Sequence, residues 1–299
     1  MFSNQNTFSE KEKVFLLFVI PTLPNNCEQR KAIRETWASG KWSNLSDIEP
    51  YYKTFKIMFI VANLDLKKNS KYDERFLEEV KTHNDIWIND ILNEERRVLK
   101  YKVIWGMLRS LQEFDFDYLV KTDDDIFVDL PLLLRYMIPL NRTNTYTGNC
   151  KFKYGGWDEF PVYPYCSGGG YVLSQDVVSA IMLINKKVKL SCFKASTFFL
   201  ASRKYFKDFD LITVTLLSFQ VRVMIRPEDG YTGYLIHLLN TEQGRGITPL
   251  LPPNGVIEAL KFGYKCGISQ ALFWHKMGGE GKMLQMFGIL NGDLSPVEC

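Results

Sequence analysis

The sequence lacks any hydrophobic run long enough to cross a membrane. A spanning helix needs about 20 consecutive, mostly apolar residues. The nearest candidate is residues 14–20, seven residues of Val, Phe, Leu and Ile. Seven residues are also short for the apolar core of a secretion signal. The run instead predicts a buried β-strand.

An excess of one charge sign is also missing. The chain has 37 Lys and Arg against 34 Asp and Glu, for a net charge of +3. This balance argues against nucleic acid or an anionic membrane surface as a partner, since both select strongly basic patches. No Cys-x-x-Cys pair occurs, which disfavours a zinc knuckle. No GxxxxGK[ST] loop occurs, which disfavours a nucleoside triphosphate site of that type.

The cysteines leave the redox compartment open. They lie far apart, at Cys27, Cys150, Cys166, Cys192, Cys266 and Cys299. Their even number permits up to three disulfides in an oxidising compartment, or six thiols in the cytosol. Two N-glycosylation sequons begin at Asn44 and Asn141 and point weakly to the secretory route.

The pattern that is present predicts an α/β fold. Apolar residues make up 46% and charged residues 24% of the chain, as in a folded globular protein. Buried strands are expected over residues 14–20, 55–61 and 117–122, and helices over residues 28–37, 73–82 and 94–114, with a helix starting near Pro131. Strands that alternate with helices predict a mostly parallel sheet covered on both faces.

The predicted domain organisation is simple. Residues 1–13 are polar and expected to be loose, and residues 14–299 are expected to form a single domain. Residues 191–220 are rich in Phe, Leu, Ser, Thr and Lys without clean periodicity. We expect them to be a surface insertion outside the sheet, because long connections without regular structure are uncommon inside compact domains.

The strongest local signal is the acidic triplet Asp123, Asp124 and Asp125, which directly follows an apolar strand. The carboxyl edge of an open α/β sheet is where ligands bind. Neighbouring carboxylates repel each other unless a cation binds them, and hard oxygen ligands suit Mg²⁺ or Mn²⁺ bridged to phosphates. The plain alternative is a solvated acidic turn. Hydrolases with an aspartyl nucleophile are disfavoured, because Phe127 stands where they need a threonine.

Three weaker signals follow along the chain. Residues 163–172 combine tyrosines with three consecutive glycines, which suits close approach of a sugar ring but also a simple turn. Glu228 and Asp229 precede a helix-like run, where carboxylates are favoured by the helix dipole whatever their function. His275 lies beside Phe273 and Trp274, an environment in which a histidine is usually just packed.

Taken together and in this order, four segments resemble the β-1,3-galactosyltransferase and β-1,3-N-acetylglucosaminyltransferase family, with fringe-type transferases as more distant relatives. The segments are Arg-Lys-Ala-Ile-Arg-Glu-Thr-Trp (30–37), Lys-Thr-Asp-Asp-Asp-Ile-Phe-Val (121–128), Tyr-Pro-Tyr-Cys-Ser-Gly-Gly-Gly-Tyr (163–171) and Glu-Asp-Gly-Tyr-Thr-Gly (228–233). The resemblance covers roughly residues 14–290. It departs from the family pattern at Gly169 and Gly230, which replace a threonine and a valine.

The resemblance implies a GT-A-type, Rossmann-like sandwich that takes a UDP-sugar donor, a glycan acceptor and a divalent cation, usually Mn²⁺. It implies Asp125, Asp123 and His275 as metal ligands, and Arg34, Lys100 and Asp124 as donor contacts. It implies Asp229 as the base of an inverting transfer of galactose or N-acetylglucosamine. It implies contacts to the acceptor or the sugar from Trp157, Tyr165, Gly168, Gly169, Gly170 and Glu228.

The resemblance also implies a place in the cell. Members of this family are Golgi membrane proteins with a lumenal catalytic domain. We expect the same here, with membrane contact only through an anchor that the given sequence does not contain. Two other functions stay open: a catalytically silent relative that binds glycan or acts as a chaperone, and a cytosolic phosphate-handling hydrolase.

Overall fold

The computed structural model describes residues 10–43, 45–63, 73–93, 99–151, 163–187, 228–252, 273–274 and 280–291. The strands are β1 (Glu12–Pro21), β2 (Phe55–Asn63), β3 (Ile86–Asn93), β4 (Phe114–Thr122), β5 (Phe127–Val128), β6 (Tyr146–Lys151), β7 (Tyr165–Ser174) and β8 (Phe273–Trp274). The helices are α1 (Cys27–Glu35), α2 (Glu49–Tyr52), α3 (Glu74–His83), α4 (Leu99–Glu113), α5 (Leu130–Met137), α8 (Glu228–Gln243) and α9 (Glu280–Asn291), and residues 175–187 are also helical.

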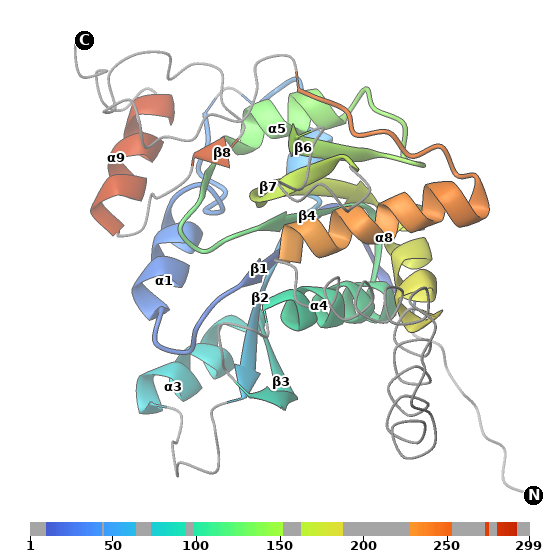
Figure 1. Cartoon of the computed structure of the whole chain (residues 1–299). Helices are drawn as coiled ribbons and strands as arrows, with labels where there is room; N and C mark the ends of the chain where they lie inside the picture. Colours follow the sequence, from blue (N-terminus) through green and yellow to red (C-terminus); the bar gives the residue numbers. More distant parts are fainter. Residues whose placement is uncertain are drawn as a thin grey trace, which may run out of the picture.

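The main sheet has six strands in the order β3-β2-β1-β4-β7-β6 (Figure 1). The first four are parallel to one another. β7 runs antiparallel to β4, and β6 runs antiparallel to β7. A small second sheet pairs β5 with β8. The expected α/β sandwich around a mostly parallel sheet is therefore confirmed.

Helices cover both faces of this sheet, and β1 shows how the sequence produces two cores. Its side chains alternate: Leu17 and Val19 join the core under α4 and α8, while Leu16, Phe18 and Ile20 join the core under α1, α5 and α9. All five are fully buried. A strand covered on both faces reads as a continuous apolar run, which explains the composition of residues 14–20.

Local signals set the helix boundaries. The side chain of Asp73 accepts a hydrogen bond from the backbone N–H of Arg75 (3.0 Å), which caps α3, and Asn84 ends that helix in the left-handed conformation (φ 49°). Asp129 caps α5 by accepting from the N–H of Leu132 (3.0 Å). Such caps satisfy backbone N–H groups that have no partner within the helix. Pro131 lies in the first turn of α5, as expected.

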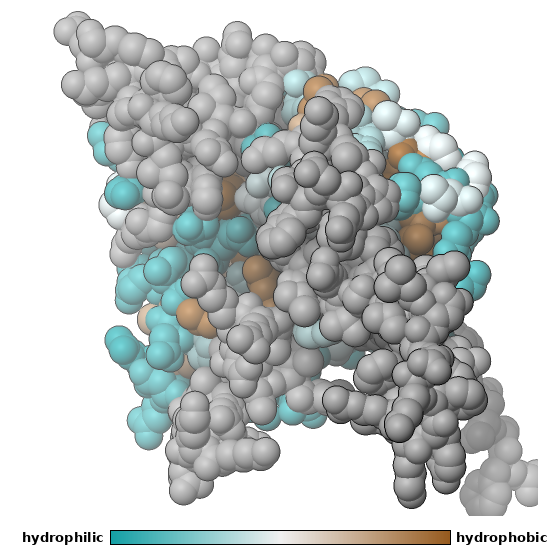
Figure 2. Space-filling view, in the orientation of Figure 1, coloured by the Kyte–Doolittle hydropathy of each residue, from teal (hydrophilic) through white to brown (hydrophobic). Residues whose placement is uncertain are grey.

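The described surface over α1 and α3 is mainly hydrophilic (Figure 2). These helices bury only a narrow stripe: Arg30, Ala32 and Ile33 in α1, and Phe76 in α3. Within the described ranges, no helix is long and apolar enough to span the membrane.

Most of the expected elements appear within a few residues of their predicted positions. The sequence analysis did not predict the strands β3, β5, β6, β7 and β8 or the helices α2 and α9. β1 starts at Glu12, two residues inside the segment that was expected to be loose. The helix expected over 94–114 is present as α4, and residues 94–98 lie outside the described residues. Residues 1–9 and the expected insertion at 191–220 also lie outside them.

Gly106 allows α4 to lie directly on the sheet. A Cβ at this position would lie 2.1 Å from Cδ1 of Ile60 and 2.9 Å from Cγ1 of Val19. We therefore expect Gly106→Ala to lower the free energy of unfolding by about 1–3 kcal/mol, because overpacking outweighs the better helix propensity of alanine. Chemical denaturation measures this directly.

Gly281 in α9 is the matched control, since nothing lies within 4 Å of a Cβ added there. Gly281→Ala should leave stability unchanged or raise it by up to about 1 kcal/mol. If both substitutions stabilise the protein equally, the close approach of α4 to the sheet is wrong.

Candidate active site

The acidic triplet follows β4, next to the point where the strand order of the sheet reverses. β1 has β2 on one side and β4 on the other, so chain connections diverge between β1 and β4. Oδ2 of Asp124 accepts hydrogen bonds from Oγ1 of Thr22 (2.6 Å) and from Nδ2 of Asn26 (2.7 Å), which lie between β1 and α1. Ligands of open α/β sheets bind at such a switch point, outside the carboxyl ends of the strands.

Lys121 joins three segments that are far apart in the sequence. Its ammonium lies 2.7 Å from Oδ1 of Asp123 and 3.2 Å from Oε2 of Glu228. It also donates a hydrogen bond to the carbonyl oxygen of Gly168 (2.6 Å). The side chain is only 1% exposed. Burial alone would lower the pKa of Lys121, but the carboxylates of Asp123 and Glu228 raise it above its ordinary value, so the ammonium stays charged.

Glu228 is the buried partner of this ammonium at the start of α8. Its Oε1 accepts hydrogen bonds from the hydroxyls of Tyr171 and, at 3.3 Å, Thr232. Burial raises the pKa of Glu228, while Lys121 and Tyr171 act in the opposite direction. Burial and then the charge of Glu228 raise the pKa of Tyr171 well above its ordinary value, which keeps the phenol protonated as a donor.

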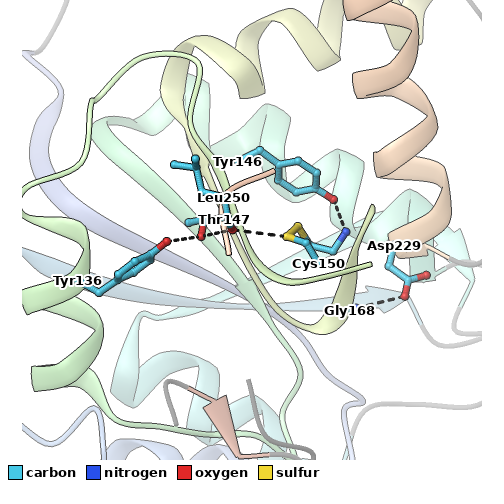
Figure 3. The surroundings of a disulfide bond; sticks show 8 residues. Tyr136, Tyr146, Thr147, Cys150, Gly168, Asp229 and Leu250 are labelled. Atoms are coloured by element: carbon cyan, nitrogen blue, oxygen red, sulfur yellow. Dashed lines mark hydrogen bonds between the residues drawn. A yellow bond between two sulfur atoms is a disulfide. The ribbon is translucent and has the colours of Figure 1, made fainter. Parts of the chain in front are cut away.

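Asp229 is the next residue, and its carboxylate is only partly buried. Oδ1 accepts from the backbone N–H of Gly230 (2.7 Å), and Oδ2 accepts from the N–H of Gly168 (3.2 Å; Figure 3). Both oxygens are therefore oriented by backbone donors. The first turn of a helix also favours a carboxylate through the helix dipole. The result is an oriented carboxylate in reach of solvent, which is suited to accept a proton.

Gly233 brings α8 close enough to β7 for this contact. A Cβ at position 233 would lie 2.5 Å from Cβ of Tyr165 and 3.2 Å from the carbonyl oxygen of Pro164. Tyr165 itself is half-buried near Asp229. Burial, and then the charge of Asp229, raise the pKa of its phenol. The start of α8 is thus set against the start of β7.

A disulfide between Cys150 and Cys166 joins β6 to β7 two residues before Gly168. The backbone N–H of Cys166 also donates to the hydroxyl of Tyr146 (2.7 Å), and Figure 3 shows this strand pair beside the Gly168–Asp229 contact. Among the described cysteines, Cys27 is free. The disulfide and its neighbours hold the strand that carries Gly168.

Two of the residues expected to contact the donor have other neighbours. The guanidinium of Arg34 forms ion pairs with Glu79 and Asp85, each at 2.7 Å, which tie α1 to α3 and to the start of β3. Lys100 is buried, and its ammonium lies 5.0 Å from the ring centre of Tyr101 and 5.5 Å from that of Tyr231. Burial lowers the pKa of Lys100. Arg34 is thus paired with carboxylates, whereas Lys100 contacts a residue two positions from Asp229.

The structure brings together Asp123, Gly168, Glu228 and Asp229, while Trp157 and His275 lie outside the described residues. The three glycines do not form the simple turn that the sequence left open. Gly168, Gly169 and Gly170 belong to β7, where Gly170 pairs with Thr122 of β4 and the carbonyl of Gly169 accepts from the hydroxyl of Thr122 (3.0 Å).

Sequence reasoning missed Lys121, Thr22 and Asn26 as parts of this site. One signal for Lys121 was available. It directly follows the apolar residues 118–120 of a buried strand, and a buried lysine requires an anionic partner. Nothing comparable in the sequence indicated that Thr22 and Asn26 would bind Asp124.

The donor set at the end of β4 fits a hard divalent cation. Asp123 and Asp125 supply carboxylate oxygens, the ligands that Mg²⁺ and Mn²⁺ prefer. Across the described part of the chain, no three His, Cys, Asp or Glu side chains are arranged as a metal-binding group. One or two carboxylates suffice when substrate phosphates complete the coordination shell.

Comparison with known proteins identifies this region. Residues 28–155 match the model of a family described as Galactosyltransferase. This part of the chain is therefore similar to the Galactosyltransferase family. The matched part of the family domain runs from α1 to just beyond β6 and contains the acidic triplet. β7 and the Glu228–Asp229 pair follow it in the chain.

The proteins to which this chain is similar include two mammalian enzymes. The mouse (Mus musculus) β-1,3-galactosyltransferase 6 is 32% identical over 190 residues, and the human UDP-GalNAc:β-1,3-N-acetylgalactosaminyltransferase 1 is 28% identical over 193 residues. Each match covers 58% of this chain and 55% of the relative, so the chain spans about half the length of the relatives it matches. The solved structure of the galactosyltransferase LgtC, in complex with donor and acceptor sugar analogs, covers 94% of this chain and 97% of its own, at 11% identity and a TM-score of 0.41.

Proposed function

We propose that the chain is an inverting, metal-dependent β-1,3-glycosyltransferase that moves galactose or N-acetylglucosamine from a UDP-sugar to a glycan hydroxyl. The main support is the position of the buried Lys121 ammonium at the switch point of the sheet. It contacts both Asp123 of the acidic triplet and Glu228, the neighbour of Asp229. The family model that residues 28–155 match, and the two similar mammalian proteins, which are named as β-1,3 sugar transferases, support the same reaction class.

In this proposal, Asp123 and Asp125 would hold a divalent cation such as Mn²⁺, and His275 is a further candidate ligand. A cation bound there would supply positive charge for the departing UDP. Asp124 is held through one oxygen by Thr22 and Asn26, so it fixes the turn between β4 and β5 against the segment after β1. That turn is the one that carries the two proposed ligands.

Asp229 is the proposed general base. It takes the proton of the acceptor hydroxyl while the acceptor oxygen forms a bond to the anomeric carbon and the bond from that carbon to UDP breaks. A single displacement of this kind inverts the anomeric configuration. The hydrogen bonds from Gly168 and Gly230 orient the carboxylate, and each oxygen keeps a lone pair for the proton.

The proposed location is the lumen of the Golgi apparatus. The disulfide between Cys150 and Cys166 supports an oxidising compartment, since such bonds are rare in the cytosol. The same disulfide disfavours the alternative function of a cytosolic phosphate-handling hydrolase.

Release of UDP from a panel of UDP-sugars, with and without Mn²⁺, tests the proposal. We expect release only with Mn²⁺, fastest with UDP-galactose or UDP-N-acetylglucosamine, and its suppression by EDTA. Added acceptor glycans should raise the rate and yield a β-1,3-linked product. If no UDP-sugar reacts under any condition while glycan binding persists, the silent relative is the better description.

A further inference from the structure

We propose that Lys121 is a positioning residue of the transferase: it sets the geometry of the Asp229 carboxylate without contacting the reacting atoms. This inference rests on the proposed function for its kinetic part and on the structure alone for its geometric part. No part of the resemblance assigned a role to Lys121.

The first step of the argument is the number of elements that the ammonium joins. Lys121 belongs to β4, its carbonyl acceptor Gly168 belongs to β7, and Glu228 is the first residue of α8. A lysine ammonium has three N–H donors. Asp123, Gly168 and Glu228 provide three acceptors at 2.7, 2.6 and 3.2 Å. The donors of this buried group are therefore matched by the acceptors around it.

The second step is that two of these acceptors adjoin Asp229 on different sides. Glu228 precedes Asp229 in the chain, so the Lys121–Glu228 pair fixes the backbone from which the Asp229 side chain extends. Gly168 donates its own N–H to Oδ2 of Asp229 while its carbonyl accepts from Lys121. The backbone of residue 168 is thus held by Lys121 on one side and by Asp229 on the other.

The third step is chemical. A carboxylate acts as a general base only when it is aimed at the proton it removes, and a displacement of about 1 Å can lower a rate by roughly 10²-fold. Without the ammonium, Glu228 would lie buried beside Tyr171 and Thr232 with no cation. It would then repack or protonate, and the start of α8 would move with it.

A double-mutant cycle between Lys121→Met and Asp229→Asn tests the kinetic part. Lys121→Met alone should lower kcat by about 10²-fold. In the Asp229→Asn background the same substitution should lower kcat by less than about threefold, because the group it positions is already gone. Lys121→Arg, which keeps the charge, should recover part of the rate. Lys53→Met, which removes an exposed ammonium paired with Glu49, should leave kcat unchanged.

Hydrogen exchange at the Gly168 amide tests the geometric part without requiring activity. Protection of this amide should fall in Lys121→Met and should be unchanged in Lys53→Met. Each variant is measured below its own thermal transition, so that local and global opening are separated.

The outcomes separate the two proposals. If the wild-type chain transfers no sugar, the proposed function fails, and exchange at Gly168 still decides the geometric role. If the wild-type chain is active and Lys121→Met lowers kcat equally in both backgrounds, Lys121 acts independently of Asp229 and the inference is wrong. Unchanged protection of Gly168 in folded Lys121→Met overturns it as well.

Discussion

Asp125→Ala is expected to abolish the Mn²⁺-dependent binding of UDP. Asp125 lies in the turn that follows β4, at the switch point of the sheet, and is one of only two aspartates that we assign to the cation. When so few protein ligands hold a cation, losing one removes a large part of its binding free energy. Calorimetric titration of UDP in the presence of Mn²⁺ should show an affinity at least about 100-fold weaker than that of the wild type. Loss of a residue that only hydrogen-bonds to a metal ligand already lowers metal affinity by about 10–100-fold, and loss of a ligand should lower it by at least as much.

Asp115→Ala is the matched control, because Asp115 belongs to the same strand but lies near its opposite end and is exposed. It should leave UDP affinity unchanged. A titration without Mn²⁺ gives the second comparison, since the wild type and Asp125→Ala should then bind UDP equally weakly. Full Mn²⁺-dependent affinity in Asp125→Ala would remove this residue from the metal site.

The core strands were predictable because burial on both faces leaves a signal in the sequence. β1 and β2 contain long apolar runs and β4 contains a short one, residues 118–120, so the positions of these strands could be predicted from the sequence. β3 is an outer strand that includes Asn89 and Asp90, so it lacks such a run. β7 contains three glycines, which have low strand propensity, and its place depends on pairing with β4 and β6 and on a disulfide.

The candidate site was predictable only in part. The acidic triplet and Asp229 could be singled out because their residue types and positions at element ends suggest chemistry. Their connection could not be predicted, because it depends on the antiparallel register that sets Gly170 against Thr122. That register places the carbonyl of Gly168 beside Lys121.

The neighbours of Arg34 could not be predicted from the sequence either. Its position in a family-like segment suggested a donor contact. However, its carboxylate partners Glu79 and Asp85 lie about 50 residues further along the chain, and only the fold brings them to the guanidinium.

Asp229→Asn is expected to lower kcat by roughly 10²–10⁴-fold while leaving the affinity for UDP with Mn²⁺ within about twofold of the wild type. The amide has nearly the size of the carboxylate but cannot take the proton of the acceptor hydroxyl. It also has a single acceptor oxygen, so either Gly168 or Gly230 loses its hydrogen bond, which should cost about 1–3 kcal/mol of stability. Kinetics are therefore measured well below the lowered melting temperature.

Asp73→Asn makes the same chemical change at the start of another helix, where the side chain caps α3. Because asparagine caps a helix about as well as aspartate, kcat and stability should both stay near wild-type values. The contrast between the two substitutions separates loss of a base from loss of a carboxylate at a helix terminus. If Asp229→Asn instead weakens UDP binding in parallel with kcat, Asp229 is a donor contact. If it keeps full activity, the proton goes to another group. Glu228 is poorly placed to take it, because it is buried and already bonded to Lys121, Tyr171 and Thr232.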